Sequence, residues 1–245
     1  YTDASDGTKV ELSTTVQAAN DHTLYAHWAV NSYTINFDSD GGSSVASITQ
    51  DYGVAVVAPT APTKAGYTFD SWSPVVPETM PAENMTLTAQ WAVVTYSIVY
   101  NLGGGTNDDA NPATYTIETS DITLSPATKA GYTFAGWYDA AEGGTLVESI
   151  AEGSAGNRTL YARWTAKGYT VTFDAQDGTV TPGTQQVTFD SAYGELPTPT
   201  RTGYTFDGWY TDASGGTKVE SSTTVQTVND HTLYAHWAVN SYTIN

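Results

Sequence analysis

Hydrophobic and polar residues alternate with a period of two in short stretches of this chain, and that alternation predicts β-strands. An opening strand of β-branched and aromatic residues is expected three times, at residues 33–37, 96–100 and 169–173. A turn rich in Asp and Gly follows each one, because these residues tolerate positive φ. A second strand, paired with the first as a hairpin, is expected at residues 45–49, 113–118 and 184–189.

Two further strands carry the tryptophans. The phrase Gly-Tyr-Thr-Phe, with a Trp three residues later, predicts a third strand with the core residues Tyr67, Phe69, Trp72, Tyr132, Phe134, Trp137, Tyr204, Phe206 and Trp209. The last strand carries Thr-Leu-Tyr-Ala-His-Trp or a near copy, and it ends at Trp28, Trp91, Trp164 and Trp237. Its Leu, Ala and Trp stay apolar in every copy while the positions between them vary. We therefore predict that Leu, Ala and Trp face the core.

The spacing of the closing tryptophans divides the chain into modules. They lie 63, 73 and 73 residues apart, and residues 1–36 reappear as residues 210–245 with 32 of 36 positions identical. A fixed period of this size is typical of a tandem array of small domains. The expected modules are half of a truncated repeat, three complete repeats and the first strand of another, at residues 1–28, 33–91, 96–164, 169–237 and 242–245.

One segment, between the second and third strands, leaves room for a short helix or helical turn. The phrase Tyr52-Gly53 matches Tyr193-Gly194, and prolines follow both phrases. Because proline ends a helix, any helix there is brief.

The repeat at residues 33–91 departs from the others. It is shorter by about ten residues after Trp72, has three prolines there, and carries Ser71 where the other repeats have Gly136 and Gly208. Its strands are expected to persist, while the geometry of this loop stays open.

Four residues always separate a closing Trp from the next opening Tyr, as in residues 29–32. A flexible linker would vary in length and favour Gly, Ser or Pro. These joints are constant and partly apolar. We therefore expect modules joined almost strand to strand, with restricted hinge motion, as an elongated rod.

The composition narrows the function. The 245 residues include 8 Lys plus Arg against 26 Asp plus Glu, a net charge of −18, and the basic residues are spread singly. Such a chain repels phosphate backbones, so nucleic acid is not expected as a partner. There is no Cys, which excludes disulfides and thiolate metal sites. No stretch approaches the roughly 20 apolar residues of a membrane span, so no membrane insertion is expected in this segment.

The pairing of Gly-Tyr-Thr-Phe-x-Gly-Trp with Thr-Leu-Tyr-Ala-x-Trp about 20 residues later resembles the Listeria-Bacteroides repeat, the family that includes the B-repeat of listerial internalins. The resemblance covers essentially the whole chain. It implies a mainly β fold of tandem β-grasp-like, ubiquitin-like modules in long secreted or surface proteins of bacteria. Such arrays act as stalks or spacers and sometimes as weak adhesive or signalling elements. It implies no catalytic residue.

Acidic turns supply the candidate metal ligands. Asp38, Asp40, Asp174 and Asp177 follow opening strands and carry oxygens that calcium could use. A calcium loop needs about six well-spaced oxygens and a closing bidentate Glu, which these turns lack. Asp and Gly are also the ordinary residues of hairpin turns. The turn interpretation is favoured, and calcium stays an alternative.

The remaining polar residues form no catalytic set. His22 with His27, and His231 with His236, lie five residues apart and are expected at the surface, not at a zinc site. No Ser, His and Asp set recurs at a fixed register, and no carboxylate pair stands out from the scattered acids. We expect neither enzyme activity nor a cofactor.

Aromatic residues leave a binding role open. The chain has 7 Trp, 17 Tyr and 6 Phe. Rows of Trp and Tyr bind sugars by stacking, but small modules without disulfides use the same residues as core. The core interpretation is favoured for Trp. Tyr25, Tyr161 and Tyr234, at variable positions of the last strand, remain candidate surface contacts for a glycan.

The favoured function is a stalk or spacer segment of a large bacterial cell-surface or secreted protein, which extends a functional domain away from the cell. Its partners are the neighbouring repeats of the same polypeptide. The alternative is an adhesive or carbohydrate-binding module with a host or extracellular glycan or protein as partner, and a self-assembling fibre is less favoured. Both chain ends resemble cuts through a longer polypeptide. The half repeat at residues 1–28 is expected to be ordered only if it packs on residues 33–91 or on another chain.

Overall fold

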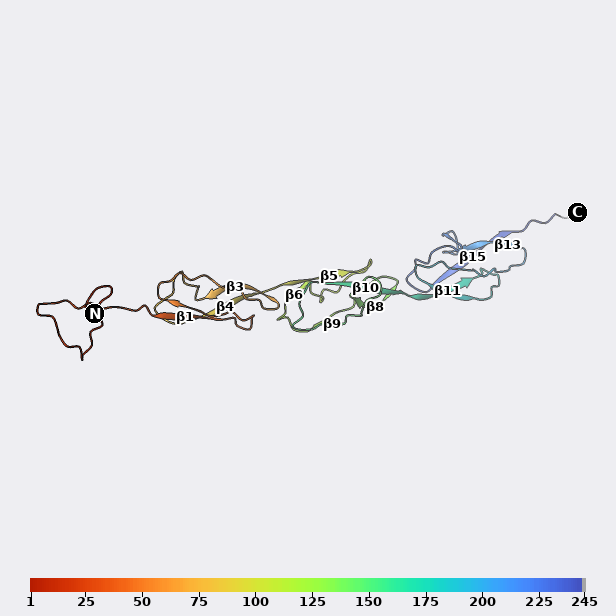
Figure 1. The fold of residues 1–245 in the computed structure, drawn as a ribbon. Coiled ribbons are helices and arrows are strands. Elements are labelled where there is room, and N and C mark those ends of the chain that lie inside the picture. Colours follow the sequence, from red (N-terminus) through yellow and green to blue (C-terminus); the bar gives the residue numbers. More distant parts are fainter. Residues whose placement is uncertain (244–245) are drawn as a thin grey trace. The chain divides into compact units, whose positions relative to one another are not determined.

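The computed structural model describes residues 1–243, and every regular element in that range is a β-strand (Figure 1). The chain divides into two compact units, Tyr1–Val94 and Thr95–Asn245. The first unit holds one four-stranded sheet, whereas the second holds a four-stranded, a five-stranded and a two-stranded sheet. The prediction of a mainly β chain of small tandem modules is confirmed.

The sheet of the first unit has the strand order β2-β1-β4-β3. Its strands are β1 (Ser32–Asp38), β2 (Ile48–Asp51), β3 (Tyr67–Ser73) and β4 (Met85–Val93). β1 is antiparallel to β2 and parallel to β4, and β3 is antiparallel to β4. The opening strand and the closing strand of the repeat therefore lie side by side in the middle of the sheet. This pairing needs both halves of the repeat.

The second unit begins with a repeat of the same order, β6-β5-β10-β8. Its strands are β5 (Tyr96–Asn101), β6 (Thr114–Tyr115), β8 (Tyr132–Tyr138) and β10 (Arg158–Ala166). A small separate sheet pairs β7 (Ile122–Thr123) with β9 (Ser149–Ile150).

The last repeat has the order β12-β11-β15-β13-β14. Its strands are β11 (Gly168–Asp174), β12 (Thr184–Thr188), β13 (Tyr204–Tyr210), β14 (Lys218–Val219) and β15 (His231–Val239). β11 and β15 are parallel, as β1 and β4 are in the first unit.

Each complete repeat has its own core on one side of the sheet. Three equivalent residues are buried in every complete repeat: one from the opening strand, the Leu of the closing strand and the Trp of the third strand. These core residues are Ile35, Leu87 and Trp72, then Ile98, Leu160 and Trp137, then Val171, Leu233 and Trp209, none more than 7% exposed. Because side chains alternate along a strand, residues such as Asn36 and Val99 on the opposite face are exposed.

No helix occurs within residues 1–243, so the segments that follow Tyr52 and Tyr193 are not helical. The matched Tyr-Gly phrases are also not equivalent. Tyr52 donates its N–H to the residue before β1, as Phe189 does to the residue before β11, which pairs Tyr52 with Phe189. Tyr193 instead corresponds to Val56, because each donates its N–H to the segment that precedes the closing strand of its repeat. The two Tyr-Gly phrases therefore lie four residues apart in the hydrogen-bond register, since Tyr193 follows Phe189 by four residues.

The Ser71 position has a packing explanation. In the longer repeats a Cβ on Gly136 or Gly208 would collide with the side chain of Leu146 or Lys218, which lies across it. The repeat at residues 33–91 has lost the segment that supplies this side chain. A serine therefore fits there, and β3 keeps the same bulge and pairing to β4.

Residues 1–31 and 241–243 carry no strand. Residues 1–31 form turns and irregular segments that precede β1 (Figure 1). Residues 241–243 are likewise without regular structure. The strand expected at residues 242–245 thus falls partly on residues 244–245, which lie outside the described residues.

Candidate functional site

The closing tryptophan of each complete repeat is locked to the turn after the opening strand. Its indole N–H donates to a turn carbonyl: Trp91 to Ser39 at 3.1 Å, Trp164 to Leu102 at 2.9 Å and Trp237 to Ala175 at 2.9 Å. A glycine three residues further lies against the ring, where a Cβ would come within 2.5 to 2.7 Å of it: Gly42, Gly105 and Gly178. The turn glycine and the tryptophan therefore form one packing unit that closes the core.

A basic residue covers this unit. It lies over the Tyr of the Gly-Tyr-Thr-Phe phrase, 4.7 Å from Lys64 to Tyr67, 4.1 Å from Lys129 to Tyr132 and 4.0 Å from Arg201 to Tyr204. The two lysines also donate to turn carbonyls at 2.8 Å, and Arg201 pairs with Asp177 at 3.2 Å. The cation–π contacts hold the basic residue on the third strand, and its polar contacts connect it to the turn after the first strand. They explain the constant register of the basic residue.

The side chain before each closing strand ties the repeat together. An oxygen of this side chain accepts the backbone N–H of the second or third residue of the opening strand: Asn84 from Thr34 at 2.8 Å, Asn157 from Ser97 at 2.9 Å and Asp230 from Thr170 at 2.8 Å. Asn84 and Asn157 begin sequences of the N-glycosylation type, yet their side chains serve this structural bond. The bond again requires both halves of a repeat.

A specific joint connects the two repeats of the second unit. The Tyr132 ring meets the Phe189 ring edge-on with centroids 5.4 Å apart, and its hydroxyl donates to Asp190 at 2.8 Å. The backbone of Lys167, between the repeats, donates to Gly131 and accepts from Phe189, each at 2.9 Å. A Cβ on Gly131 would overlap the Phe189 ring, so glycine is needed there. The joint therefore has defined contacts on both sides of the linker.

The joint changes the acidity of its tyrosine. The hydrogen bond to Asp190, with smaller contributions from burial and from the Asp190 charge, raises the pKa of Tyr132 above its ordinary value. Tyr132 thus stays a neutral donor to the carboxylate over the usual pH range. The sequence marked Tyr132 as core and Phe189 as the last residue of the second strand. It gave no sign that Phe189 and Asp190 contact the preceding repeat, because the end of this strand varies between repeats.

The calcium candidates lie in ordinary turns. Asp38 and Asp174 each accept a backbone N–H from two residues further on, at 3.0 and 2.9 Å. Asp40 is 3.6 Å from Lys64, and Asp177 is paired with Arg201. Across residues 1–243 no three acidic or His side chains converge as metal ligands would. The calcium interpretation therefore gains no geometric support.

The surface candidates are less open than the pattern predicted. Tyr25 is 43% exposed, whereas Tyr161 and Tyr234 are half-buried. His231 is hydrogen-bonded to Tyr193 at 2.7 Å, and His236 stacks on Tyr210 with ring centres 3.9 Å apart. Both histidines thus pack within their repeat.

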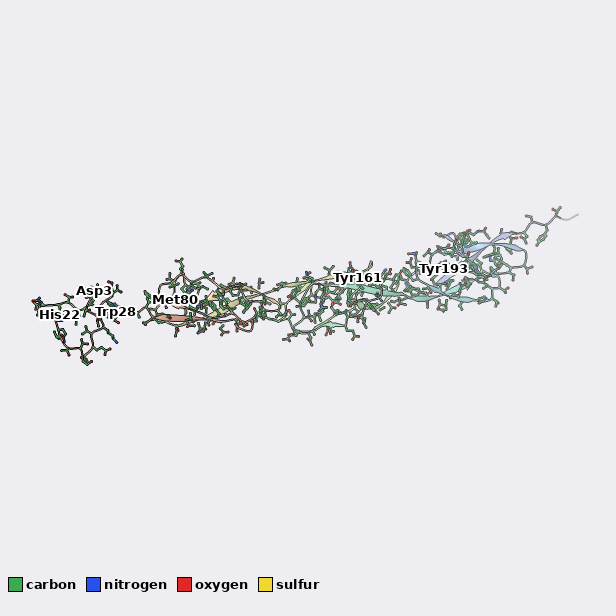
Figure 2. All side chains as sticks on the ribbon, in the orientation of Figure 1. Asp3, His22, Trp28, Met80, Tyr161 and Tyr193 are labelled. Carbon is green, nitrogen blue, oxygen red and sulfur yellow. The ribbon has the colours of Figure 1, made fainter. Side chains whose placement is uncertain are left out.

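Trp28 corrects the core prediction. It is 91% exposed, and Figure 2 shows it on the irregular N-terminal segment together with Asp3 and His22. No described residues provide the turn carbonyl, glycine and Tyr that enclose its counterparts. The tryptophan therefore needs the opening half of a repeat to be buried. The other tryptophans of the predicted core are buried or partly buried in the three complete repeats.

Comparison with known proteins assigns the same four segments to one family. The family model described as the Listeria-Bacteroides repeat domain matches residues 1–27, 33–90, 96–163 and 169–236. A protein of Evansella cellulosilytica named "Putative Gly-rich membrane protein" is 32% identical over 91% of this chain and 26% of its own length. Internalin H of Listeria monocytogenes is 42% identical over 54% of this chain and 24% of its own length. The chain thus spans about a quarter of these relatives. No helix within residues 1–243 is long and apolar enough to cross a bilayer.

Proposed function

The chain belongs to the Listeria-Bacteroides repeat domain family, and from this premise we propose that it is a stalk or spacer segment of a large bacterial surface or secreted protein. Its complete repeats act as β-grasp-like modules joined end to end, and they hold a functional domain at a distance from the cell. The central parallel pair of strands with an antiparallel strand on each side supports the β-grasp-like arrangement. Relatives that include an internalin support the surface location.

The observation that carries this proposal is the joint between the last two repeats. A spacer holds a domain at a fixed distance only if its modules do not rotate freely about their linkers. Tyr132, Phe189 and Asp190 provide an aromatic contact and a charge-assisted hydrogen bond in addition to the linker. Rotation at Lys167 would break both contacts together with the two backbone bonds beside them. The joint therefore resists bending.

Charge also suits an array of similar β-modules. Exposed strand edges in neighbouring repeats invite pairing between chains. The net charge of −18 opposes the approach of one chain to another, most strongly at low ionic strength.

Residual dipolar couplings test the stiffness of the joint. In the whole chain we expect residues 96–239 to align as one body. Tyr132→Ala should separate them into two independently aligned repeats, because it removes the ring contact and the hydrogen bond. Tyr204→Ala is the matched control, since Tyr204 makes the corresponding cation–π contact, with Arg201, in the last repeat but lies outside this joint.

Small-angle scattering tests the spacer itself. The proposal predicts an elongated particle whose longest dimension falls when Tyr132→Ala is introduced. Two independently aligned repeats in the unmodified chain, or a compact scattering profile, would contradict it.

A further inference from the structure

An open groove on the last complete repeat holds polar groups that the core and the joint do not use. It has a volume of about 380 Å³ and lies among the turn after β11, the start of β13, the loop before β14, and β15. The residues that matter for its chemistry are Gln176, Arg201, Tyr204, Ser214, His236 and Trp237. Ligand pockets usually measure about 300 to 1,000 Å³, so the groove has room for a small ligand.

Several of these groups are free to bind. Within residues 1–243 the side-chain amide of Gln176 and the hydroxyl of Ser214 have no hydrogen-bond partner. Arg201 uses one terminal nitrogen for Asp177 and leaves its other N–H groups unused. The groove therefore presents both donors and acceptors, from three separate segments of the repeat.

The aromatic walls are held in place. The Trp237 indole is anchored on the carbonyl of Ala175 at 2.9 Å, and Tyr204 lies under the Arg201 guanidinium at 4.0 Å. His236 stacks on Tyr210 and donates to the Asp212 carbonyl at 3.0 Å, which fixes the loop on the other side. Side chains held in this way lose little freedom when a ligand binds.

We propose that this groove binds a neutral saccharide of one or two hexose rings. The Trp237 indole in the groove lining offers an apolar surface to the C–H groups of a sugar ring, and the free amide, hydroxyl and guanidinium match its hydroxyls. Asp177 and Asp212 lie beside the groove, and the whole chain is strongly acidic, so anionic sugars are repelled. This inference stands apart from the spacer function, which needs no ligand.

The preceding repeat supplies an internal comparison. At the corresponding positions it has Gly103 for Gln176, Glu142 for Ser214 and Arg163 for His236. The Arg163 guanidinium lies 3.7 Å from the Tyr138 ring and donates to the carbonyls of Ala140 and Gly143. Arginine at this position thus fits the fold, and it reaches the Gly143 carbonyl, the counterpart of the groove residue Gly215. We expect no saccharide site in that repeat.

NMR titration of the whole chain with maltose, cellobiose or lactose tests the proposal. At least one of these neutral disaccharides should shift the Trp237 indole signal and the amides of residues 213–215 in a saturable way, while digalacturonate should not. Gln176→Ala should weaken binding about fivefold to tenfold, the effect of one lost hydrogen bond. His236→Arg should abolish it, because the arginine copies Arg163.

The variants also separate a lost site from a lost fold. Both should keep the dispersed spectrum of the last repeat, since Gln176 makes no side-chain contact that holds the fold and arginine is accommodated in the preceding repeat. The absence of a saturable shift with all three neutral sugars would overturn the proposal. So would shifts that persist unchanged in His236→Arg, or stronger binding of the anionic disaccharide.

Discussion

Val16 and Val225 occupy the same position of a duplicated sequence, yet Val16 is 72% exposed and Val225 is completely buried. The same holds for Leu24, 53% exposed, and Leu233, 1% exposed. Residues 1–28 and 210–237 are nearly identical, so local sequence does not cause the difference. What differs is that β11, β12 and β13 cover the second copy, and no described residues cover the first.

Short-range contacts survive in both copies. The Tyr1 and His27 rings stack at 3.8 Å, as Tyr210 and His236 do at 3.9 Å. His27 also bonds the Asp3 carbonyl at 2.8 Å, the equivalent of the bond from His236 to Asp212. The loop between these residues therefore folds from its own sequence, whereas burial of the closing strand depends on residues about 60 positions earlier in the chain. Core formation is a property of the complete repeat.

Replacing the leucine of the closing strand by alanine should give the largest difference in stability between the two copies. Leu233→Ala leaves a cavity in a packed core, and such changes cost about 2–5 kcal/mol. Leu24→Ala removes an exposed side chain, so we expect a change within about 0.5 kcal/mol. Because an array of repeats need not unfold in one step, hydrogen exchange of peptides from each repeat should be measured. Equal losses of protection in the two variants would contradict the comparison.

Removing the side chain that ties the two halves together should have a smaller effect. Asp230→Ala breaks the bond to the Thr170 N–H, and we expect about 1 kcal/mol of destabilisation in the last repeat, given its exposure. Asp21→Ala, the matched control, should change nothing measurable. Chemical denaturation followed by exchange of residues 168–174 reports the effect. The explanation of this bond fails if Asp21→Ala destabilises as much.

The smallest effect concerns Tyr210. A hydrogen bond to Asp207, with smaller contributions from burial and the Asp207 charge, raises the pKa of Tyr210. This bond therefore contributes stability below the ordinary tyrosine pKa of about 10, and the contribution is lost as the pH rises through the raised pKa. Asp207→Asn should return the Tyr210 ionisation, followed by ultraviolet absorbance, towards its ordinary pH; an unchanged titration would show another cause.

The periodic pattern was sufficient to predict the positions of the strands. It was insufficient to predict which residues pack against those strands. The alternation in residues 33–37 and 169–173 correctly located β1 and β11, because it reflects burial on one face of a sheet. Trp28 was wrongly predicted to be buried, because the sequence around it is the same whether or not partner strands are present. The match of Tyr52 to Tyr193 was misleading because a local phrase recurs more easily than a hydrogen-bond register. The contact of Phe189 and Asp190 with the preceding repeat was not predicted, because a contact between repeats leaves no periodic signal in the sequence.

Hydrogen exchange of the unmodified chain tests the central claim most directly, that a closing half is buried only within a complete repeat. Peptides from residues 10–28 and 219–237 have nearly the same sequence, so their intrinsic exchange rates are nearly the same. We predict rapid exchange in residues 10–28 and strong protection in residues 219–237, centred on Leu233 and Ala235. Equal protection of the two segments in the monomeric chain would contradict the account.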